Sequence, residues 1–353
     1  MRIFLLPFSF IFRFVVWVRN KLYKYELIKT KSLSCKVISI GNVSSGGTGK
    51  TPMVEHVTRY FIDKGKSVAV ILKGYKRVYD DMQVAEFGYK NTEGRLNAEN
   101  FGDEALMLLE NLPKTQSGRG LLIVSDNKIS GAKFADNKFK PDAVIIDDGF
   151  QLRKLLRDLD IVMVNPYEKK HLLPVGNFRE PFKSVKRADI ILFNHKFSDN
   201  INLLHKGNLS SVVDCSYELV NFANIKNEVL EEKQIKAIAF CGIGDPQSFK
   251  KLLERINADI LQFIRFSDHH GFKKEDIEKI ISAYKNENAG CILTTQKDFV
   301  RLKYPQSPGT ELQKTVYELL TNYPLYYANI KLQILQNEHL LNKKLENLLL
   351  EMR

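Results

Sequence analysis

The feature that most constrains this chain is a glycine-rich turn between a predicted strand and a predicted helix. Residues 41–52 read Gly-Asn-Val-Ser-Ser-Gly-Gly-Thr-Gly-Lys-Thr-Pro. A β-branched run, 35–40, precedes the turn, and helix-forming residues follow from Pro52. This order is the context of a phosphate-binding P-loop, in which backbone N–H groups and a helix N-terminus hold phosphate oxygens. The sequence therefore predicts a nucleotide-binding α/β fold.

The P-loop gives candidate roles to consecutive residues. Ser44 occupies the position of the first glycine in the general pattern, but the core that follows is kept. Lys50 is expected to reach the β- and γ-phosphates, and the Thr51 hydroxyl to ligate Mg²⁺. The predicted nucleotide-binding residues are Ser44, Ser45, Gly46, Gly47, Thr48, Gly49, Lys50 and Thr51.

A second signal is the apolar strand 143–147, which ends in the two carboxylates of Asp147 and Asp148. In P-loop enzymes an acidic residue at such a strand end holds the Mg²⁺, directly or through water. The alternative is a plain Asp-Gly turn. The nearby P-loop favours the metal site, and the choice between Asp147 and Asp148 stays open.

Buried strands alternate with helical patterns along most of the chain, which predicts a parallel sheet covered on both faces. The predicted strands are 35–40, 67–72, 121–125, 143–147, 161–164 and 189–193, with helices over 104–112 and 127–135 between them. A polar stretch near 221–233 ends this pattern, and further elements follow it. The sequence therefore predicts a P-loop NTPase-type domain over 35–220 and a smaller α/β domain over 221–353.

The N-terminus is apolar and aromatic. The run 3–18 contains one charged residue, Arg13, and basic residues follow at Arg19, Lys21 and Lys24. As a helix it would span roughly 24 Å, short of the ~30 Å hydrocarbon core of a membrane. We expect residues 1–34 to form a helix lying in the membrane interface, with its basic side chains on lipid phosphates. Packing on the protein's own core and a true membrane span are the alternatives.

Three further groups have a chemical and a structural interpretation. Asp103 opens a helix, where it is either an N-cap, which the residues alone favour, or a base in phosphoryl transfer. His269, next to Asp268, is either a proton acceptor or part of a cap on the helix at Lys274. Arg179 follows a rigid turn and is either a phosphate clamp or a surface ion pair.

The formal net charge of +12 suggests a polyanionic partner such as nucleic acid, an anionic membrane or a phosphorylated substrate. The chain shows no Arg-rich helix and no aromatic RNA-binding pattern, so a nucleic-acid partner is not expected. Its four cysteines lack metal-ligand spacing, which argues against a zinc or redox site.

Taken together, the motifs resemble those of the tetraacyldisaccharide 4′-kinases of lipid A biosynthesis over nearly the whole chain. The segments that carry the resemblance are Gly46-Gly47-Thr48-Gly49-Lys50-Thr51-Pro52, Gly74-Tyr75, Gly102-Asp103-Glu104, Asp147-Asp148-Gly149-Phe150-Gln151, Arg157-Asp158-Leu159-Asp160, Arg179-Glu180-Pro181, Asp268-His269 and Thr295-Gln296-Lys297-Asp298. Ser44, which departs from the general P-loop pattern, is usual in this family.

The resemblance implies a kinase that transfers the γ-phosphate of ATP to the 4′-hydroxyl of a tetraacylated glucosamine disaccharide 1-phosphate, with Mg²⁺. It implies action at the cytoplasmic face of the inner membrane of a Gram-negative bacterium, as a peripheral or monotopic protein without an obligate protein partner. Asp103 becomes the expected base and His269 its partner, with Lys50 in the catalytic set. The implied substrate or metal contacts are Glu104, Lys128, Gln151, Arg179 and Glu180.

The chain departs from the family pattern at a few positions. Leu152 stands where many relatives have His, Lys73 replaces an Arg before Gly74, and Lys128 replaces an Arg, which loses a bidentate fork. The main alternative is a membrane-associated P-loop ATPase switch. Such switches carry a signature lysine just before the paired glycines, where this chain has Ser45.

Overall fold

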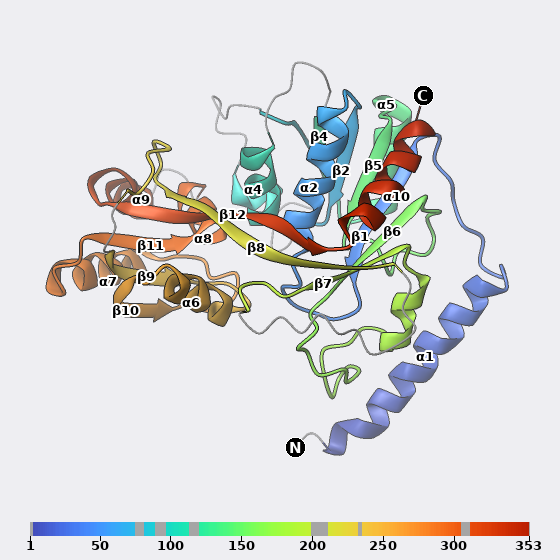
Figure 1. Cartoon of the computed structure of the whole chain (residues 1–353), viewed down its shortest axis with the longest axis horizontal. Coiled ribbons are helices and arrows are strands. Elements are labelled where there is room, and N and C mark those ends of the chain that lie inside the picture. Colours follow the sequence, from blue (N-terminus) through green and yellow to red (C-terminus); the bar gives the residue numbers. More distant parts are fainter. Residues whose placement is uncertain are drawn as a thin grey trace.

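The chain folds around one twelve-stranded sheet, in the order β10-β9-β11-β12-β8-β7-β6-β1-β5-β2-β4-β3 (Figure 1). The computed structural model describes residues 3–74, 81–88, 97–112, 120–198, 211–231, 235–304 and 311–352. The strands are β1 Lys36–Asn42, β2 Val68–Leu72, β3 Gln83–Glu86, β4 Gly120–Val124, β5 Ala143–Asp147, β6 Leu159–Val164, β7 Ile190–Asn194, β8 Val212–Ala223, β9 Lys236–Cys241, β10 Asp259–Arg265, β11 Cys291–Thr295 and β12 Leu325–Gln336.

Helices connect most of these strands. They are α1 Leu6–Lys24, α2 Lys50–Asp63, α3 Ala98–Phe101, α4 Asp103–Asn111, α5 Lys128–Lys138, α6 Pro246–Arg255, α7 Lys274–Asn286, α8 Gln296–Lys303, α9 Glu311–Asn322 and α10 Glu338–Leu350, with the 3₁₀ turns η1 Ile3–Leu5 and η2 Phe182–Arg187. The strands and helices predicted from the sequence are present, with boundaries that differ by a few residues at most.

We call the part built on β1–β7 the P-loop half. Here β1 pairs in parallel with β5 and β6, and the side chains of β1 alternate between two cores. Ile38 and Ile40 pack with residues of α2 and α4, whereas Val37 packs on the opposite face with residues of α5. Helices therefore cover both faces of this parallel sheet, as predicted, and the carboxyl end of β1 leads directly into the P-loop.

We call the part built on β9–β11 the C-terminal half. Alternate residues of β9 again enter different cores: Ile238 and Phe240 pack with residues of α7, α8 and α9, whereas Ala237 and Ala239 pack with residues of α6. These strands pair in parallel. The predicted α/β character of this region is confirmed.

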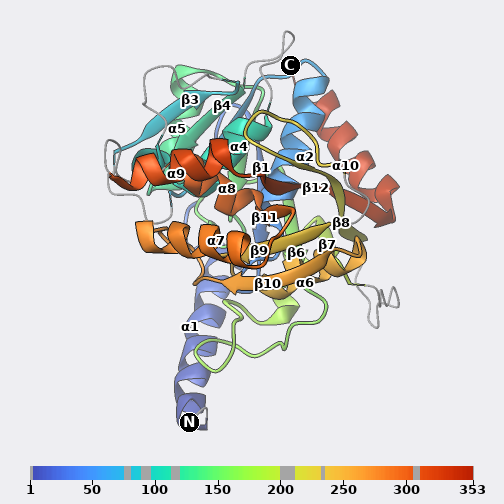
Figure 2. The same cartoon turned by 90° about the vertical axis from the view of Figure 1, so that its left-hand side faces the viewer.

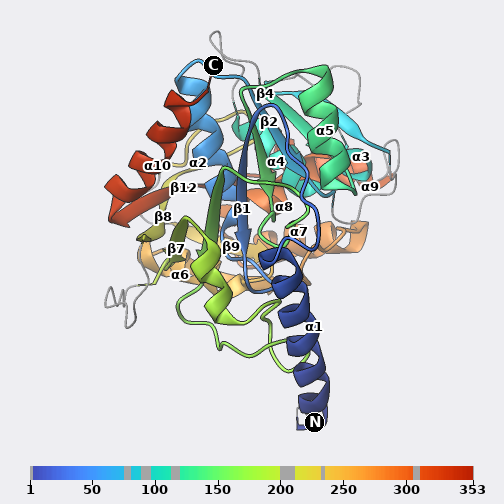
Figure 3. The ribbon, with the colours of Figure 1, turned by 90° about the vertical axis from the view of Figure 1, so that its right-hand side faces the viewer.

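A long antiparallel ribbon, β8–β12, joins the two halves into a single sheet (Figure 1). β8 pairs with β7 at its start, and β12 pairs with β11 at its start, so each strand begins in a different half. Among the described strands, the other antiparallel pair is β3–β4 at the edge. The division at residues 220 and 221 stays a prediction, and the helix after β12, α10, packs in the core of α2 (Figure 3).

The N-terminal helix α1 extends away from the rest of the molecule, with the N-terminus at its far end (Figures 2 and 3). Among its described residues only Val16 is buried. Polar contacts hold its C-terminal part: Arg19 and Asn20 reach Glu180 at 2.8 and 3.2 Å. Within the described part of the chain, no helix is both long enough and apolar enough to cross a membrane.

Candidate functional site

The P-loop runs from the end of β1 to the start of α2 and needs glycine where its backbone is left-handed. Gly49, the residue before α2, has a φ of 94°, and Gly46 has a φ of 118°. A Cβ on Gly49 would lie 2.2 Å from Asn194 Nδ2 and from the Tyr217 hydroxyl. The backbone at Gly49 therefore lies against the side chains of Asn194 at the end of β7 and Tyr217 in the middle of β8, which leaves no room for a side chain.

Hydrogen bonds from neighbouring elements fix the loop. Asn42 Nδ2 donates to Thr48 Oγ1 at 2.9 Å, and Asn194 Nδ2 donates to the Thr48 carbonyl at 3.0 Å. On the other side, the Ser45 N–H donates to the Asn177 carbonyl at 2.7 Å. The Ser44 hydroxyl donates to Glu168 at 2.7 Å. A loop restrained in this way is preorganised to present its amides to an anion.

Predicted residues from distant parts of the sequence meet at the carboxyl end of β5. Lys50 Nζ lies 3.5 Å from Asp148 Oδ1, and Arg179 Nη1 donates to Asp148 Oδ2 at 2.8 Å. Lys128 Nζ donates to the carbonyls of Asp147 and Asp148 at 2.6 and 3.1 Å. The three cations and two carboxylates form one cluster beside the P-loop.

The two carboxylates differ in their electrostatics. Burial, with help from nearby Glu104 and Asp148, raises the pKa of Asp147 to about 6 against the opposing charges of Lys50 and Lys128. Burial also acts on Asp148, but there Lys50, Lys128 and Arg179 outweigh it and lower the pKa. Asp147 Oδ1 is buried without a hydrogen-bond partner in the described structure. Such an orphaned oxygen fits a site for a divalent cation, which prefers oxygen ligands.

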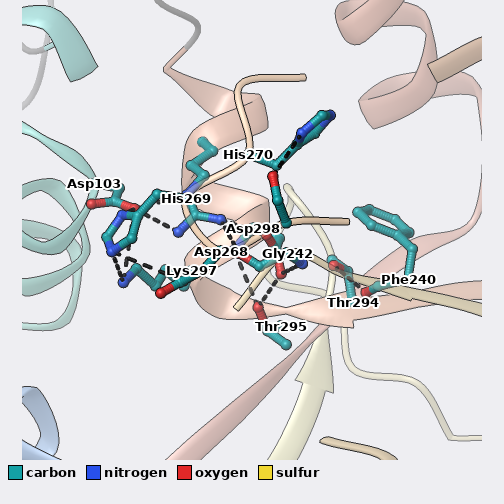
Figure 4. A network of polar contacts seen from close by, with 12 residues as sticks. Asp103, Phe240, Gly242, Asp268, His269, His270, Thr294, Thr295, Lys297 and Asp298 are labelled. Atoms are coloured by element: carbon teal, nitrogen blue, oxygen red, sulfur yellow. Dashed lines mark hydrogen bonds and ion pairs between the residues drawn. The ribbon is translucent and has the colours of Figure 1, made fainter. Parts of the chain in front are cut away.

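A second cluster joins the P-loop half to the C-terminal half (Figure 4). Asp103 is the first residue of α4, and Gly102, not Asp103, is the N-cap. Asp103 Oδ2 lies 3.1 Å from Nδ1 of His269, which follows β10 in the other half. The same oxygen accepts from Arg301 Nε at 2.7 Å. Asp103 Oδ1 still accepts from the Glu104 N–H at 2.9 Å in the first turn of α4, and the structure also brings Asp103 and His269 together.

The remaining predicted substrate residues lie around these clusters. Glu104 receives the Lys297 ammonium at 3.0 Å, and Lys297 Nζ lies 3.3 Å from His269 Nε2. Gln151 Nε2 donates to the Asn42 carbonyl at the base of the P-loop, 2.8 Å away. Glu180 points elsewhere: it is buried beneath α1 with Arg19 and Arg187. Tyr75, part of the Gly74-Tyr75 motif, lies outside the described residues.

Some contacts were not anticipated. Asn194 ends β7 and touches the P-loop, and Arg301 on α8 touches Asp103. Asn194 and Arg301 carry no motif of their own. The spacing from Lys297 and Asp298 to Arg301, one helical turn, was the available signal, because residues three and four apart share a helix face.

The parallel sheet, the P-loop and the carboxylates at the adjacent strand end define a P-loop nucleotide-binding α/β protein. The sequence model of the tetraacyldisaccharide-1-P 4′-kinase family matches residues 1–350, so this chain belongs to that family.

Curated relatives agree with this assignment. A tetraacyldisaccharide 4′-kinase of Chlorobium phaeovibrioides is 34% identical over 85% of this chain and 86% of its own length. The enzyme of Chlorobium chlorochromatii is 32% identical over 96% of this chain and 91% of its own. Among solved structures, LpxK from Aquifex aeolicus in complex with ATP superposes with a TM-score of 0.74 at 28% identity, covering 98% of this chain and 99% of that one.

Proposed function

We propose that this chain transfers the γ-phosphate of ATP to the 4′-hydroxyl of a tetraacyldisaccharide 1-phosphate, a step of lipid A biosynthesis. The observation that carries the proposal is the convergence of a restrained P-loop, a cation-lined carboxylate pair and the Asp103–His269 pair in a member of this family. The similar LpxK structure contains ATP, which supports ATP as the phosphate donor.

The P-loop, Ser44 to Thr51, would receive the phosphates through backbone N–H groups other than those of Ser45 and Thr48, which already donate to Asn177 and Gly46, and through the N-terminus of α2. Lys50 would leave Asp148 for the β- and γ-phosphates, because a triphosphate offers it more negative charge than one carboxylate. Lys128 and Arg179, which already lie beside Asp148, would add positive charge where the γ-phosphate passes.

Thr51, Asp147 and Asp148 are the residues that would hold Mg²⁺. The buried Oδ1 of Asp147, which has no hydrogen-bond partner in the described structure, and the raised pKa of its carboxyl support its role as a metal ligand. When bound, the ion would neutralise charge on the β- and γ-phosphates. Within the described residues no larger group of acidic, His or Cys ligands is present, which suits Mg²⁺, since it usually takes few protein ligands plus phosphate oxygens.

The Asp103–His269 pair would take the proton from the acceptor hydroxyl. The pKa of Asp103 is held below its ordinary value: burial opposes this, but the His269 hydrogen bond and the Lys297 and Arg301 charges prevail. Asp103 is therefore an anion at neutral pH and holds His269 through Nδ1. Glu104, Gln151, Lys128 and Arg179 are proposed as contacts for the acceptor or the transferred phosphate, whereas Glu180 is bound to Arg19 and Arg187 away from both clusters.

The lipid acceptor requires the protein to work at a membrane. We propose that α1 lies on the anionic cytoplasmic face of the inner membrane, as a peripheral or monotopic anchor. Its exposed aromatic side chains support this: Phe4, Phe8, Phe10 and Phe14 are each at least 60% exposed. Interfacial helices of this kind bury aromatic rings among the lipids and place basic residues on their phosphates.

Phosphate release from ATP without acceptor tests the proposal against the ATPase switch. A kinase that waits for its acceptor releases little phosphate alone, and addition of the disaccharide 1-phosphate lipid should raise ATP consumption by at least tenfold. Consumption at the same rate with and without the lipid would favour the switch.

A further inference from the structure

We propose that Arg301 is the positioning residue of this site: it fixes the Asp103 carboxylate toward His269 and joins α4 to the C-terminal half. The proposal rests on the proposed function, because it assumes that Asp103 and His269 handle the proton.

Arg301 donates hydrogen bonds to protein groups through Nε and Nη1, whereas its buried Nη2 makes an ion-pair contact without a hydrogen bond. Its Nε and Nη2 both lie 2.7 Å from Asp103 Oδ2. Its Nη1 donates to the Gly242 carbonyl at 2.6 Å and to Asp298 Oδ1 at 2.8 Å. The side chain is only 8% exposed. Because the side chain is buried and all of its contacts are with protein groups, centred on Asp103 and Asp298, we infer that it acts through Asp103 rather than directly on a phosphate.

A second carboxylate, that of Asp298, fixes Arg301 in turn. Asp298 is completely buried, and its Oδ2 accepts from the Gly242 N–H at 3.0 Å and from the Thr295 hydroxyl at 2.6 Å. A Cβ on Gly242 would lie 3.2 Å from Asp298 Oδ1, a close approach that favours glycine. The result is a chain of contacts from Asp298 through Arg301 and Asp103 to His269.

The chain of contacts bridges the two halves of the molecule. Asp103 belongs to α4 of the P-loop half, whereas Arg301 and Asp298 belong to α8 and Gly242 follows β9. The Asp103–His269 pair can only stay aligned if α4 and α8 keep their relative position. Arg301 holds Oδ2, the oxygen that also faces His269, and the Glu104 N–H donates to Oδ1 at 2.9 Å, so the orientation of the carboxylate is fixed as well as its place.

Arg301 is also one of the groups that keep Asp103 ionised. The charged groups that the structure places against the Asp103–His269 pair are Glu104 on α4, Asp268 beside His269, and Lys297 and Arg301 on α8. Removal of the Arg301 charge takes away one of the influences that lower the pKa of Asp103. The Asp103 carboxylate would then protonate at a higher pH.

The test compares Arg301→Gln with Lys303→Gln as a matched control. Lys303 lies on the same helix and also reaches α4, through Glu110, but does not contact Asp103. We expect Arg301→Gln to lower kcat by roughly tenfold to 100-fold and to move the acid limb of the kcat/KM pH profile to higher pH, with the KM for ATP unchanged. The control should change none of these. Equal behaviour of the two variants would overturn the proposal.

Arg301→Lys keeps the test decisive if Arg301→Gln fails to fold. Lysine keeps the charge but cannot contact Asp103 through two nitrogens. The acid limb of the kcat/KM pH profile should therefore stay in place while kcat still falls. A full kcat in a folded Arg301→Lys protein would show that the guanidinium geometry has no positioning role.

The Asp103→Asn background separates this proposal from the proposed function. If Arg301 acts through Asp103, Arg301→Gln should add little to the loss caused by Asp103→Asn. An Asp103→Asn protein with near wild-type turnover would refute the base assignment itself. A strong loss in Asp103→Asn combined with wild-type behaviour of Arg301→Gln would refute the positioning role alone.

Discussion

Asp147 is a residue at which folding and function oppose each other. Its carboxyl is buried at the end of β5, one oxygen lacks a partner in the described structure, and its pKa rises to about 6. At neutral pH the folded protein therefore holds an ionised carboxylate that burial disfavours. The buried charge of Asp147 destabilises the metal-free protein, and binding of a cation removes this destabilisation.

Asp147→Asn should therefore stabilise the metal-free protein while it abolishes metal-dependent turnover. The pKa of Asp147 is higher in the folded than in the unfolded protein. The ionised carboxylate therefore lowers the free energy of unfolding above about pH 6, and this effect disappears as the pH falls toward 3.8, the pKa in the unfolded chain. We expect a gain on the order of 1–3 kcal/mol at pH 7.5, shrinking toward zero near pH 4. Urea unfolding at both pH values measures it.

Asp148→Asn is the matched control, with the opposite sign expected. The cations Lys50, Lys128 and Arg179 lower the pKa of Asp148, so its charge stabilises the folded state above the unfolded pKa. Loss of stability at pH 7.5 in both variants would contradict the electrostatic description of Asp147.

Gly49→Ala should damage the P-loop through backbone strain and contact. The φ of 94° disfavours any side chain, and a Cβ would meet Asn194 and Tyr217 at 2.2 Å. We expect a loss of about 1–3 kcal/mol in unfolding free energy and weaker ATP binding in calorimetry. Gly47→Ala should leave stability unchanged, because nothing lies within 4 Å of a Cβ there. A Gly49→Ala protein as stable as Gly47→Ala would argue against the described loop conformation.

At the residue scale, the sequence predicted site residues that belong to a recognisable local motif, but not contacts between residues far apart in the sequence. Lys50 and Asp147 follow strands that can be recognised, and their meeting follows from parallel strand ends sharing one edge of a sheet. Asp103 and His269 were named from resemblance, and their contact depends on how two halves pack. Arg301 was missed, because its partner Asp103 is far away in the sequence and no local pattern reports such a contact.

At the element scale, α1 has an apolar surface that the protein itself does not cover. Phe10 and Phe14 are 67% and 62% exposed, whereas Val16 is buried. Arg153 stacks on Tyr23, and Arg19 binds the buried Glu180, so the C-terminal turns of the helix are fixed to the body. The exposed turns lie toward the N-terminus, which extends away from the body (Figure 2).

Replacing Phe10 and Phe14 with Ser should weaken binding to vesicles of phosphatidylethanolamine and phosphatidylglycerol by about tenfold or more, because each ring contributes roughly 1.5–3 kcal/mol when buried. Co-sedimentation measures the effect. Tyr317→Ser on α9 is the control, since Tyr317 is also 67% exposed but lies on another helix. Equal vesicle binding by both variants and the wild type would contradict the membrane assignment of α1.

The ribbon β8–β12 shows why some elements could not be predicted. β8 begins with five buried residues, then alternates partly buried and exposed positions as it leaves the P-loop half, and ends on two buried residues. The polar stretch after it suggested a domain boundary, but the pairing partner of β8 is β12, about a hundred residues later. Sequence patterns report local periodicity, whereas strand pairing at this separation depends on packing.

At the scale of the whole molecule, the last helix of the chain packs against the core of the P-loop half. After the C-terminal half, β12 leads back and α10 packs beside α2, with Leu341, Leu345 and Leu348 in the core that contains Ile38. The alternation of buried strands and helices predicted the parallel sheet and its two covered faces. It did not predict that the last helix would complete the core next to the P-loop.

Leu345→Ala should therefore destabilise the nucleotide-binding core, although it lies near the end of the chain. Leu345 is fully buried, and such truncations cost about 2–5 kcal/mol. Hydrogen exchange of the β1 and α2 amides should accelerate. Leu350→Ala, at a residue 84% exposed on the same helix, is the control. Unchanged exchange in β1 and α2 would show that α10 does not support the P-loop half.

The most direct test of the whole account is the transfer of label from γ-labelled ATP to purified tetraacyldisaccharide 1-phosphate in the presence of Mg²⁺. We expect the wild-type protein to label the lipid, and Asp103→Asn to label it at least 100-fold more slowly while it still binds ATP. A folded wild-type protein that binds ATP but leaves the lipid unlabelled would contradict the account.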